Sequence, residues 1–123
     1  MATVHFEDRE LECRCGCGGL PGREFQDDLE ALRSEYGRPM IITSGFRCRP
    51  HNLAVSGRAD GPHTLGLAVD VRARGEATLA LTAVALSGGW SGIGWNQTGN
   101  DRFVHLDRLE HTTERPRPAA WSY

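Results

Sequence analysis

Four apolar residues recur every three or four positions between residues 23 and 36, which is the period of an amphipathic helix. They are Phe25, Leu29, Leu32 and Tyr36. Gly37 and Pro39 follow them, and this pair is typical of a helix end. We therefore expect a helix over Arg23–Tyr36 whose apolar face packs against the core.

Short runs of apolar and β-branched residues predict strands at four further places. They are Pro39–Ser44, Leu67–Val71, Ser91–Trp95 and Arg102–Asp107. The last two flank a turn-forming segment and are expected to form a hairpin. Two more helices are expected, a short one from Pro50 that Gly57 closes and a buried one over Gly75–Leu86. This order predicts an α+β fold with helices on one face of a small, mainly antiparallel sheet.

The two ends of the chain carry weaker patterns. The first 22 residues are polar and rich in glycine, with Phe6 and Leu11 as the expected anchors on the core. The segment 109–123 has little periodicity, and Trp121 is expected to pack it against the rest of the protein. With 123 residues and neither a repeat nor a linker, residues 1–123 are expected to form one domain.

The composition is that of an ordinary globular protein. Hydrophobic residues make up 39%, charged residues 24%, and the net charge is -2, which gives no reason to expect nucleic acid or a charged membrane surface as a partner. No apolar run approaches the roughly 20 residues of a membrane span. The N-terminus lacks the basic start and apolar core of a signal peptide, so we expect synthesis in a cytoplasm.

Two histidines and a carboxylate lie beside or within predicted strands. His63 and Asp70 flank a small apolar run, and His105 lies in the last strand. Two imidazoles and one carboxylate are a common ligand set of catalytic zinc sites, in which a fourth position stays open for water. The alternative is a pair of unrelated histidines, one in a loop and one on a strand.

Four cysteines form a second candidate cluster, with Cys13, Cys15 and Cys17 close together and Cys48 far downstream. A structural metal site, a disulfide and ordinary thiols are the alternatives, and synthesis in a cytoplasm argues against disulfides as the default. If the first three lie in an extended segment, alternation puts them on one side. We expect at least one of them to lie near Cys48 and to tie the N-terminal segment to the Ser44–Pro50 turn.

A series of short motifs runs through the chain in order. They are Ser44-Gly45-Phe46-Arg47, His51-Asn52 with Val55, His63-x-x-Gly66-x-Ala68-x-Asp70, Gly92-Ile93-Gly94 and Phe103-Val104-His105-Leu106-Asp107. Together they resemble the zinc D-Ala-D-Ala metallopeptidases, and most closely the small M15-type peptidases common among phage lysins and bacterial cell-wall enzymes. The opening segment, Phe6 to Gly18, resembles the usual N-terminal segment of that family, so the resemblance covers nearly the whole chain.

The resemblance implies a small antiparallel sheet that carries the metal ligands between flanking helices, the fold of D-Ala-D-Ala metallopeptidases and hedgehog-like domains. It implies Zn2+ at His63, Asp70 and His105 and a substrate of peptidoglycan peptides. The expected function is hydrolysis of a peptide bond in peptidoglycan, as carboxypeptidase or endopeptidase, for example in a phage endolysin. The alternatives are a zinc-containing module that binds peptidoglycan without cleaving it, and a structural component of a virion. We expect a monomer that acts in the cell wall or periplasm after release.

Two positions depart from the family pattern. Gly61 stands where relatives often have a serine, and Arg102 stands where many have an acid three residues before the last zinc histidine. The general base therefore does not carry over from the family. Strand alternation puts Asp107 on the same face as His105, so Asp107 is the first candidate for the base. Its alternative role is to fix the tautomer of His105 or to pair with a nearby arginine.

Further candidates for the site come from the turns and the first motif. Asp101 and His51 follow Asp107 as candidates for the general base. Arg47 and Ser44 are the expected substrate-binding residues, since the planar guanidinium of Arg47 suits a substrate carboxylate or a developing oxyanion. The alternative for Arg47 is a surface ion pair.

Overall fold

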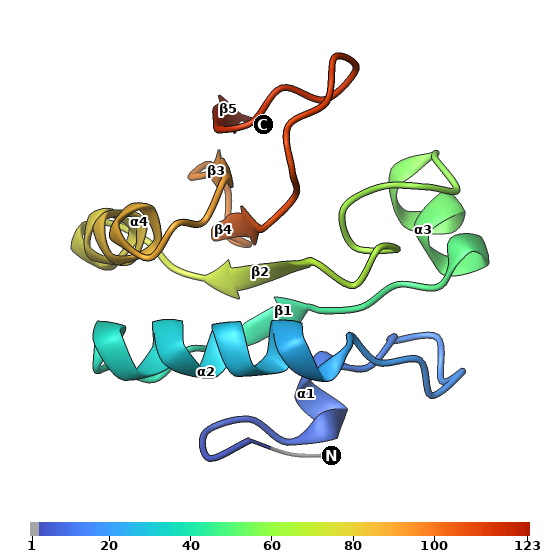
Figure 1. Ribbon diagram of the computed structural model, residues 1–123, viewed down its shortest axis with the longest axis horizontal. Coiled ribbons are helices and arrows are strands. Elements are labelled where there is room, and N and C mark those ends of the chain that lie inside the picture. Colours follow the sequence, from blue (N-terminus) through green and yellow to red (C-terminus); the bar gives the residue numbers. More distant parts are fainter. Residues whose placement is uncertain (1–2) are drawn as a thin grey trace.

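The computed structural model describes residues 3–123 and confirms the α+β class. The elements are α1 (Asp8–Leu11), α2 (Arg23–Tyr36), β1 (Ile42–Ser44), α3 (Arg49–Ser56), β2 (Ala68–Arg72), α4 (Glu76–Ser87), β3 (Gly92–Asn96), β4 (Phe103–Asp107) and β5 (Ala119–Ser122). The strands form one open sheet in the order β1-β2-β4-β3-β5 (Figure 1). All neighbours are antiparallel except β3 and β5, which are parallel.

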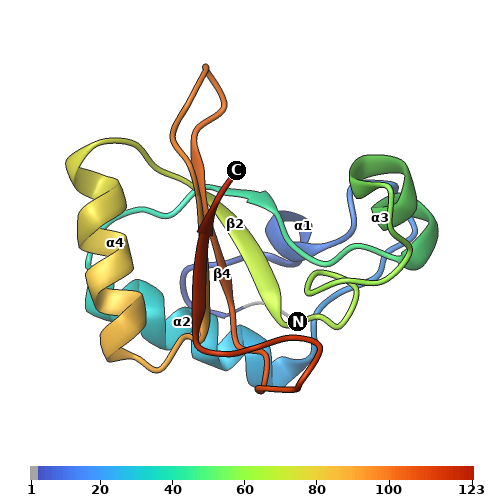
Figure 2. The same ribbon diagram turned by 90° about the horizontal axis from the view of Figure 1, so that it is seen from above.

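The apolar core lies between the sheet and the helices α2 and α4. The predicted stripe of α2 is confirmed, because Phe25, Leu29 and Leu32 are buried and Tyr36 packs half-buried against them. Leu81 and Ala85 of α4 complete the helical side of this core. Helix α3 lies on the opposite side of the sheet from α4 (Figure 2). The sequence pattern had predicted helices on one face of the sheet, and this prediction is wrong because α3 lies on the other face.

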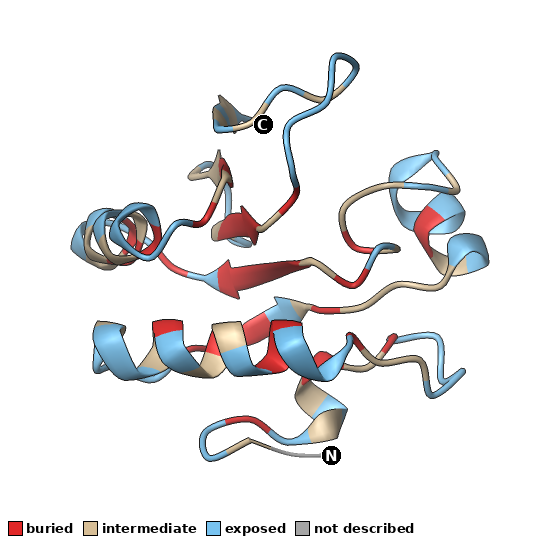
Figure 3. Ribbon diagram, viewed as in Figure 1, coloured by how far each residue is buried: buried red, intermediate tan, exposed pale blue. Residues whose placement is uncertain are grey.

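Helix α4 was expected to be buried, and the structure corrects this expectation. Leu81 and Ala85 are fully buried, but Leu79 and Leu86 on the outer side are 72% and 58% exposed. Figure 3 shows the same division of the helix into buried and exposed sides. Apolar residues occupy two thirds of the positions of this segment and are spread around the helix, so composition alone did not reveal which side faces the sheet.

Alternation along β2 and β4 separates a core face from a polar face. Val69 and Val71 of β2 join the apolar core, as do Val104 and Leu106 of β4. The residues between them point to the other face of the sheet. Asp70 lies directly opposite His105 in the antiparallel register, so the two predicted ligands are brought together by strand pairing.

The ends of the chain contain the two elements that the sequence pattern did not predict. The short helix α1 has a capping box between Glu7 and Glu10, and the expected anchors are both buried, Phe6 just before the helix and Leu11 as its last residue. β5 pairs with the edge of β3. No helix within residues 3–123 has both the length and the apolarity that crossing a membrane requires.

Candidate metal centre

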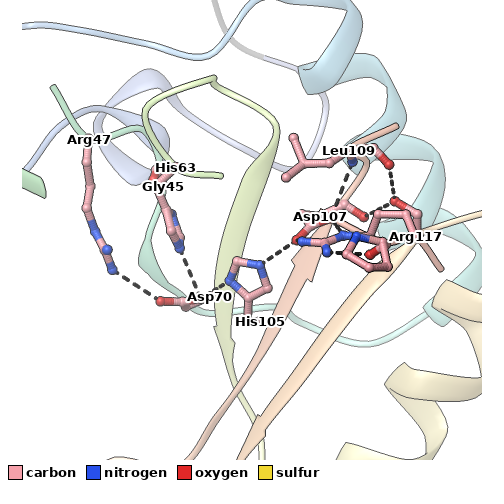
Figure 4. A network of polar contacts seen from close by, with 10 residues as sticks. Gly45, Arg47, His63, Asp70, His105, Asp107, Leu109 and Arg117 are labelled. Atoms are coloured by element: carbon pink, nitrogen blue, oxygen red, sulfur yellow. Dashed lines mark hydrogen bonds and ion pairs between the residues drawn. The ribbon is translucent and has the colours of Figure 1, made fainter. Parts of the chain in front are cut away.

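His63, Asp70 and His105 meet on the polar face of the sheet (Figure 4). Nε2 of His63 lies 3.3 Å from Oδ1 of Asp70, and Nδ1 of His105 lies 3.1 Å from the same oxygen. All three side chains are buried, and one potential ligand atom from each lies within 4.8 Å of the others. The structure thus brings together the three residues that the sequence proposed as metal ligands.

Each histidine is held by the protein through the ring nitrogen that faces away from Asp70. Nδ1 of His63 donates to the backbone carbonyl of Gly45 over 2.8 Å, and Nε2 of His105 donates to Asp107 over 2.9 Å. The other nitrogen of each ring faces Asp70 and is the atom that would coordinate a metal ion. This is how proteins fix the tautomer and orientation of metal-binding histidines, so the donor set fits a divalent cation.

The charges around the centre favour an ionised carboxylate. Burial opposes ionisation of Asp70, but hydrogen bonds from His105 and His63 outweigh it and hold the pKa of this carboxyl well below its usual value. Burial also opposes protonation of His105, but its bonds to Asp107 and Asp70 raise the pKa of this imidazole. Two buried acids thus flank the His105 ring, one on each nitrogen.

Asp107 is fully buried, and both of its oxygens are occupied. Arg117 donates to Oδ1 over 3.1 Å and to Oδ2 over 2.9 Å, and the backbone N–H of Leu109 also donates to Oδ1. Burial opposes ionisation here too, but His105 and Arg117 lower the pKa of Asp107 to about 2. Arg117 lies between two prolines in a segment without periodicity, so no sequence pattern singled it out.

Two glycines of β3 leave room for the residues behind the centre. A Cβ atom at Gly92 would overlap the carboxylate of Asp107, and one at Gly94 would overlap the indole of Trp121. Trp121 in turn packs against His105, with 5.2 Å between ring centroids. The sequence pattern predicted only that Trp121 packs the C-terminal segment against the protein, not that it contacts a candidate ligand.

Arg47 is held beside the candidate ligands by contacts of three of its nitrogens. Nε donates to Oγ of Ser44 over 2.9 Å, Nη1 donates to Oδ1 of Asn52 over 3.1 Å, and Nη2 pairs with Asp70 over 3.4 Å. Its side chain is 13% exposed, which excludes an ordinary surface ion pair. Ser44 lies opposite Asp70 in the β1–β2 register and so anchors the guanidinium beside the candidate metal ligands.

A cavity of about 470 Å³ opens onto the centre. The three candidate ligands and Arg47 line it, together with Asn52, Val55, Ser56, Arg58, Asp60, Gly61, Pro62, Phe103, Trp121 and Tyr123. Asp60 and Asp70 are the carboxylates of this lining, so Asp107 is not exposed in it. Asp101 and His51 also lie outside the lining, the first in the exposed β3–β4 turn and the second on α3.

The four cysteines converge at a separate place, where the segment after α1 meets the start of α3. Sγ of Cys13 lies 3.7 Å from Sγ of Cys48, as the sequence analysis predicted, and all four thiols are free. The segment is not extended, however. It turns at Gly16 and Gly18, which have φ values of 88° and 82°, so turning rather than strand alternation brings the sulfur atoms together.

Comparison with known families agrees with this geometry. A family described as Peptidase M15 matches residues 4–107, which include the three candidate ligands, Arg47 and all four cysteines. No curated protein matches the chain. The match ends at Asp107, so Arg117 and Trp121, which contact Asp107 and His105, lie outside it. Since the match covers most of the sequence, the chain belongs to the M15 peptidases, a family of metallopeptidases.

Proposed function

We propose that the protein is a zinc-dependent peptidase that cleaves a peptide bond in peptidoglycan, with zinc held by His63, Asp70 and His105. The observation that carries the proposal is the convergence of three buried donor groups beside an open cavity in a chain of the M15 family. Both imidazoles turn toward the same carboxylate the nitrogen that the protein does not hold, so a metal ion placed between them would meet one ligand atom from each residue.

A zinc ion held by these residues would lower the pKa of a bound water to near neutrality and would polarise the scissile carbonyl. The protein supplies orientation and charge. Gly45 and Asp107 fix the two imidazoles, and Arg117 holds the charge of Asp107 in place. Arg47 has its guanidinium at the edge of the cavity, where it would bind a substrate carboxylate or the oxyanion of the tetrahedral intermediate.

For Asp107 we propose the positioning role rather than that of general base. Its two oxygens already accept bonds from His105, Arg117 and Leu109, and it is fully buried behind the His105 ring. A base must reach the water whose proton it takes, and the contacts of Asp107 leave no oxygen turned toward the cavity.

Asp60 is our candidate for the general base. It lies in the cavity lining, and its side chain is 70% exposed, with one ion pair to Arg49 at 3.3 Å. An exposed carboxylate on a loop can change its partner during a reaction, whereas Asp70 is held by two histidines and Arg47. Asp101 and His51 do not line the cavity and are weaker candidates on this ground.

The cavity also supports an acidic peptide as substrate. Arg47 and Arg58 bring two permanent positive charges to its lining. The stem peptides of peptidoglycan carry free carboxylates, which these arginines would pair with. A carboxypeptidase would use such a contact to recognise the chain end, and an endopeptidase would use it on a side-chain carboxylate.

Digestion of purified peptidoglycan tests the proposal. The zinc-reconstituted protein is incubated with it, and the fragments are analysed by mass spectrometry. We expect new fragments in which a peptide bond has gained one water, and their identity separates carboxypeptidase from endopeptidase activity. His63→Ala should release none, while Thr113→Ala, an exposed change in the β4–β5 loop, should behave as the unmodified protein.

The same digestion distinguishes the alternative of a binding module. Arg102 in place of the usual acid favours this alternative, in which the protein holds peptidoglycan without cleaving it. Retention on insoluble peptidoglycan with zinc bound and no fragment released would overturn the hydrolase proposal in its favour.

A further inference from the structure

The four cysteine sulfurs form a compact group outside the candidate catalytic centre. Cys13 Sγ lies 3.4 Å from Cys15 Sγ and 3.7 Å from Cys48 Sγ, and the last two sulfurs are 3.5 Å apart. The Sγ atoms of all four cysteines, that of Cys17 included, lie within 4.8 Å of one another. The chain contains four cysteines, so this one place gathers them all.

These spacings fit a single metal ion and do not fit a disulfide. Four sulfurs at about 2.3 Å from a zinc ion lie at the corners of a tetrahedron with edges of about 3.8 Å. A disulfide would need about 2.05 Å between two of them and would leave the other two thiols unused. A cluster of several metal ions would hold cysteine sulfurs further apart than a single ion does.

The backbone around the sulfurs is arranged to support negative charge on them. The N–H of Cys48 donates to Sγ of Cys13, and the N–H of Gly19 donates to Sγ of Cys17, both over 3.4 Å. Such donors favour the thiolate form that binds metal. The turns at Gly16 and Gly18 require positive φ, which glycine adopts without strain.

We propose that Cys13, Cys15, Cys17 and Cys48 bind one structural zinc ion. Four thiolates in a tetrahedron form a closed site without an open position for substrate, which is typical of structural zinc. The ion would tie the polar segment after α1 to Cys48, the residue that precedes α3. Arg47 is its immediate neighbour, so the same ion would steady the turn that carries this arginine.

Metal analysis and cobalt substitution test the proposal directly. Protein purified under reducing conditions should hold one ion at the thiols in addition to any ion at the His63 centre. With cobalt in place of zinc, we expect the intense near-ultraviolet absorption of thiolate-to-cobalt charge transfer. This band should persist in His63→Ala, because His63 is not part of the thiol group, so the result does not depend on the proposed function.

Cys17→Ser gives the sharpest variant because Cys17 is exposed and contributes little to packing. We expect it to lose the charge-transfer band, to retain less zinc and to melt at a lower temperature than the unmodified protein. Thr113→Ala, which is also an exposed change, should alter none of these readouts. If Cys17→Ser fails to fold, the thiol count and metal content of the unmodified protein still decide the question.

Three results would overturn the proposal. The first is a protein that binds cobalt without the charge-transfer band. The second is a Cys17→Ser variant with unchanged metal content and melting temperature. The third is a thiol count, made after unfolding in a chelator without reductant, that falls short of all four cysteines because a disulfide has formed.

Discussion

At the scale of single residues, the centre depends on what holds the far nitrogen of each imidazole. His63 is held by a backbone carbonyl, and His105 is held by a carboxylate that Arg117 in turn holds. These contacts give Asp107 a positioning role in our account. They also lead to distinct expectations for changes at Asp107, Asp60 and Arg47.

Asp107→Asn keeps the shape of the side chain but removes the charge that faces His105. We expect zinc affinity at the His63 centre to fall by about 10–100-fold, the usual effect of losing such a partner. Arg117→Met should act in the same direction, because Asp107 then loses its bidentate partner. Zinc competition with a chelator measures the effect, with Arg74→Met as an exposed control. Full zinc affinity combined with a rate lowered about 10²–10⁴-fold would instead make Asp107 the base.

Asp60→Asn should show the opposite pattern. As the proposed base, Asp60 does not touch the ligands, so zinc affinity should stay unchanged while single-turnover rates fall by about 10²–10⁴-fold. Because the ion pair of Asp60 with Arg49 is exposed, the melting temperature should also stay close to that of the unmodified protein. Near-normal turnover would return the search to Asp101 and His51.

Arg47→Lys should lose much of the activity while the fold survives. One ammonium cannot replace the three nitrogens that contact Ser44, Asn52 and Asp70 in a fixed plane. Turnover of a defined peptidoglycan peptide, measured beside a circular dichroism spectrum, checks both parts. Unchanged turnover would remove Arg47 from the site.

Some residues of the centre could be identified from the sequence, and others could not. His63, Asp70 and His105 could be singled out because they are polar residues that stand beside or within apolar runs. Gly45 contributes a backbone oxygen, which has no signature in sequence. Arg117 is one of 14 arginines, and nothing in its neighbourhood marks it as the partner of a residue ten positions away.

At the scale of elements, the sequence pattern predicted the helices and strands whose own residues favour that structure. Helix α2 has the predicted bounds because its stripe, its glycine end and its length agree. β5 is short, contains two alanines and exists because β3 offers an open edge beside it. Alanine is a poor strand former, so tertiary pairing rather than propensity sets this strand.

Strand β3 gives a test at this scale. Gly94→Ala would place a methyl group against the indole of Trp121, which packs on His105. Overpacking of this kind costs about 1–3 kcal/mol, so we expect a lower melting temperature and a change in tryptophan fluorescence. Gly22→Ala is the matched control, because a Cβ atom there meets no atom within 4 Å. Equal melting temperatures for the two variants would show that Trp121 does not need the space at Gly94.

At the scale of the whole molecule, the sheet separates stability from chemistry. One face carries the apolar core with α2 and α4, and the other carries the candidate ligands beside the cavity. Segments far apart in sequence meet on this second face, from the β1–α3 turn to β5. The candidate ligands could be predicted from motifs, whereas part of the cavity lining comes from loops and from β5, which no local pattern predicts.

Anomalous diffraction at the zinc absorption edge, from crystals of the zinc-reconstituted protein, would locate the metal ion directly. We expect a peak bounded by His63, Asp70 and His105, whatever the state of the cysteines. Crystals that contain zinc but show no peak between these three side chains would mean that these residues do not hold the metal.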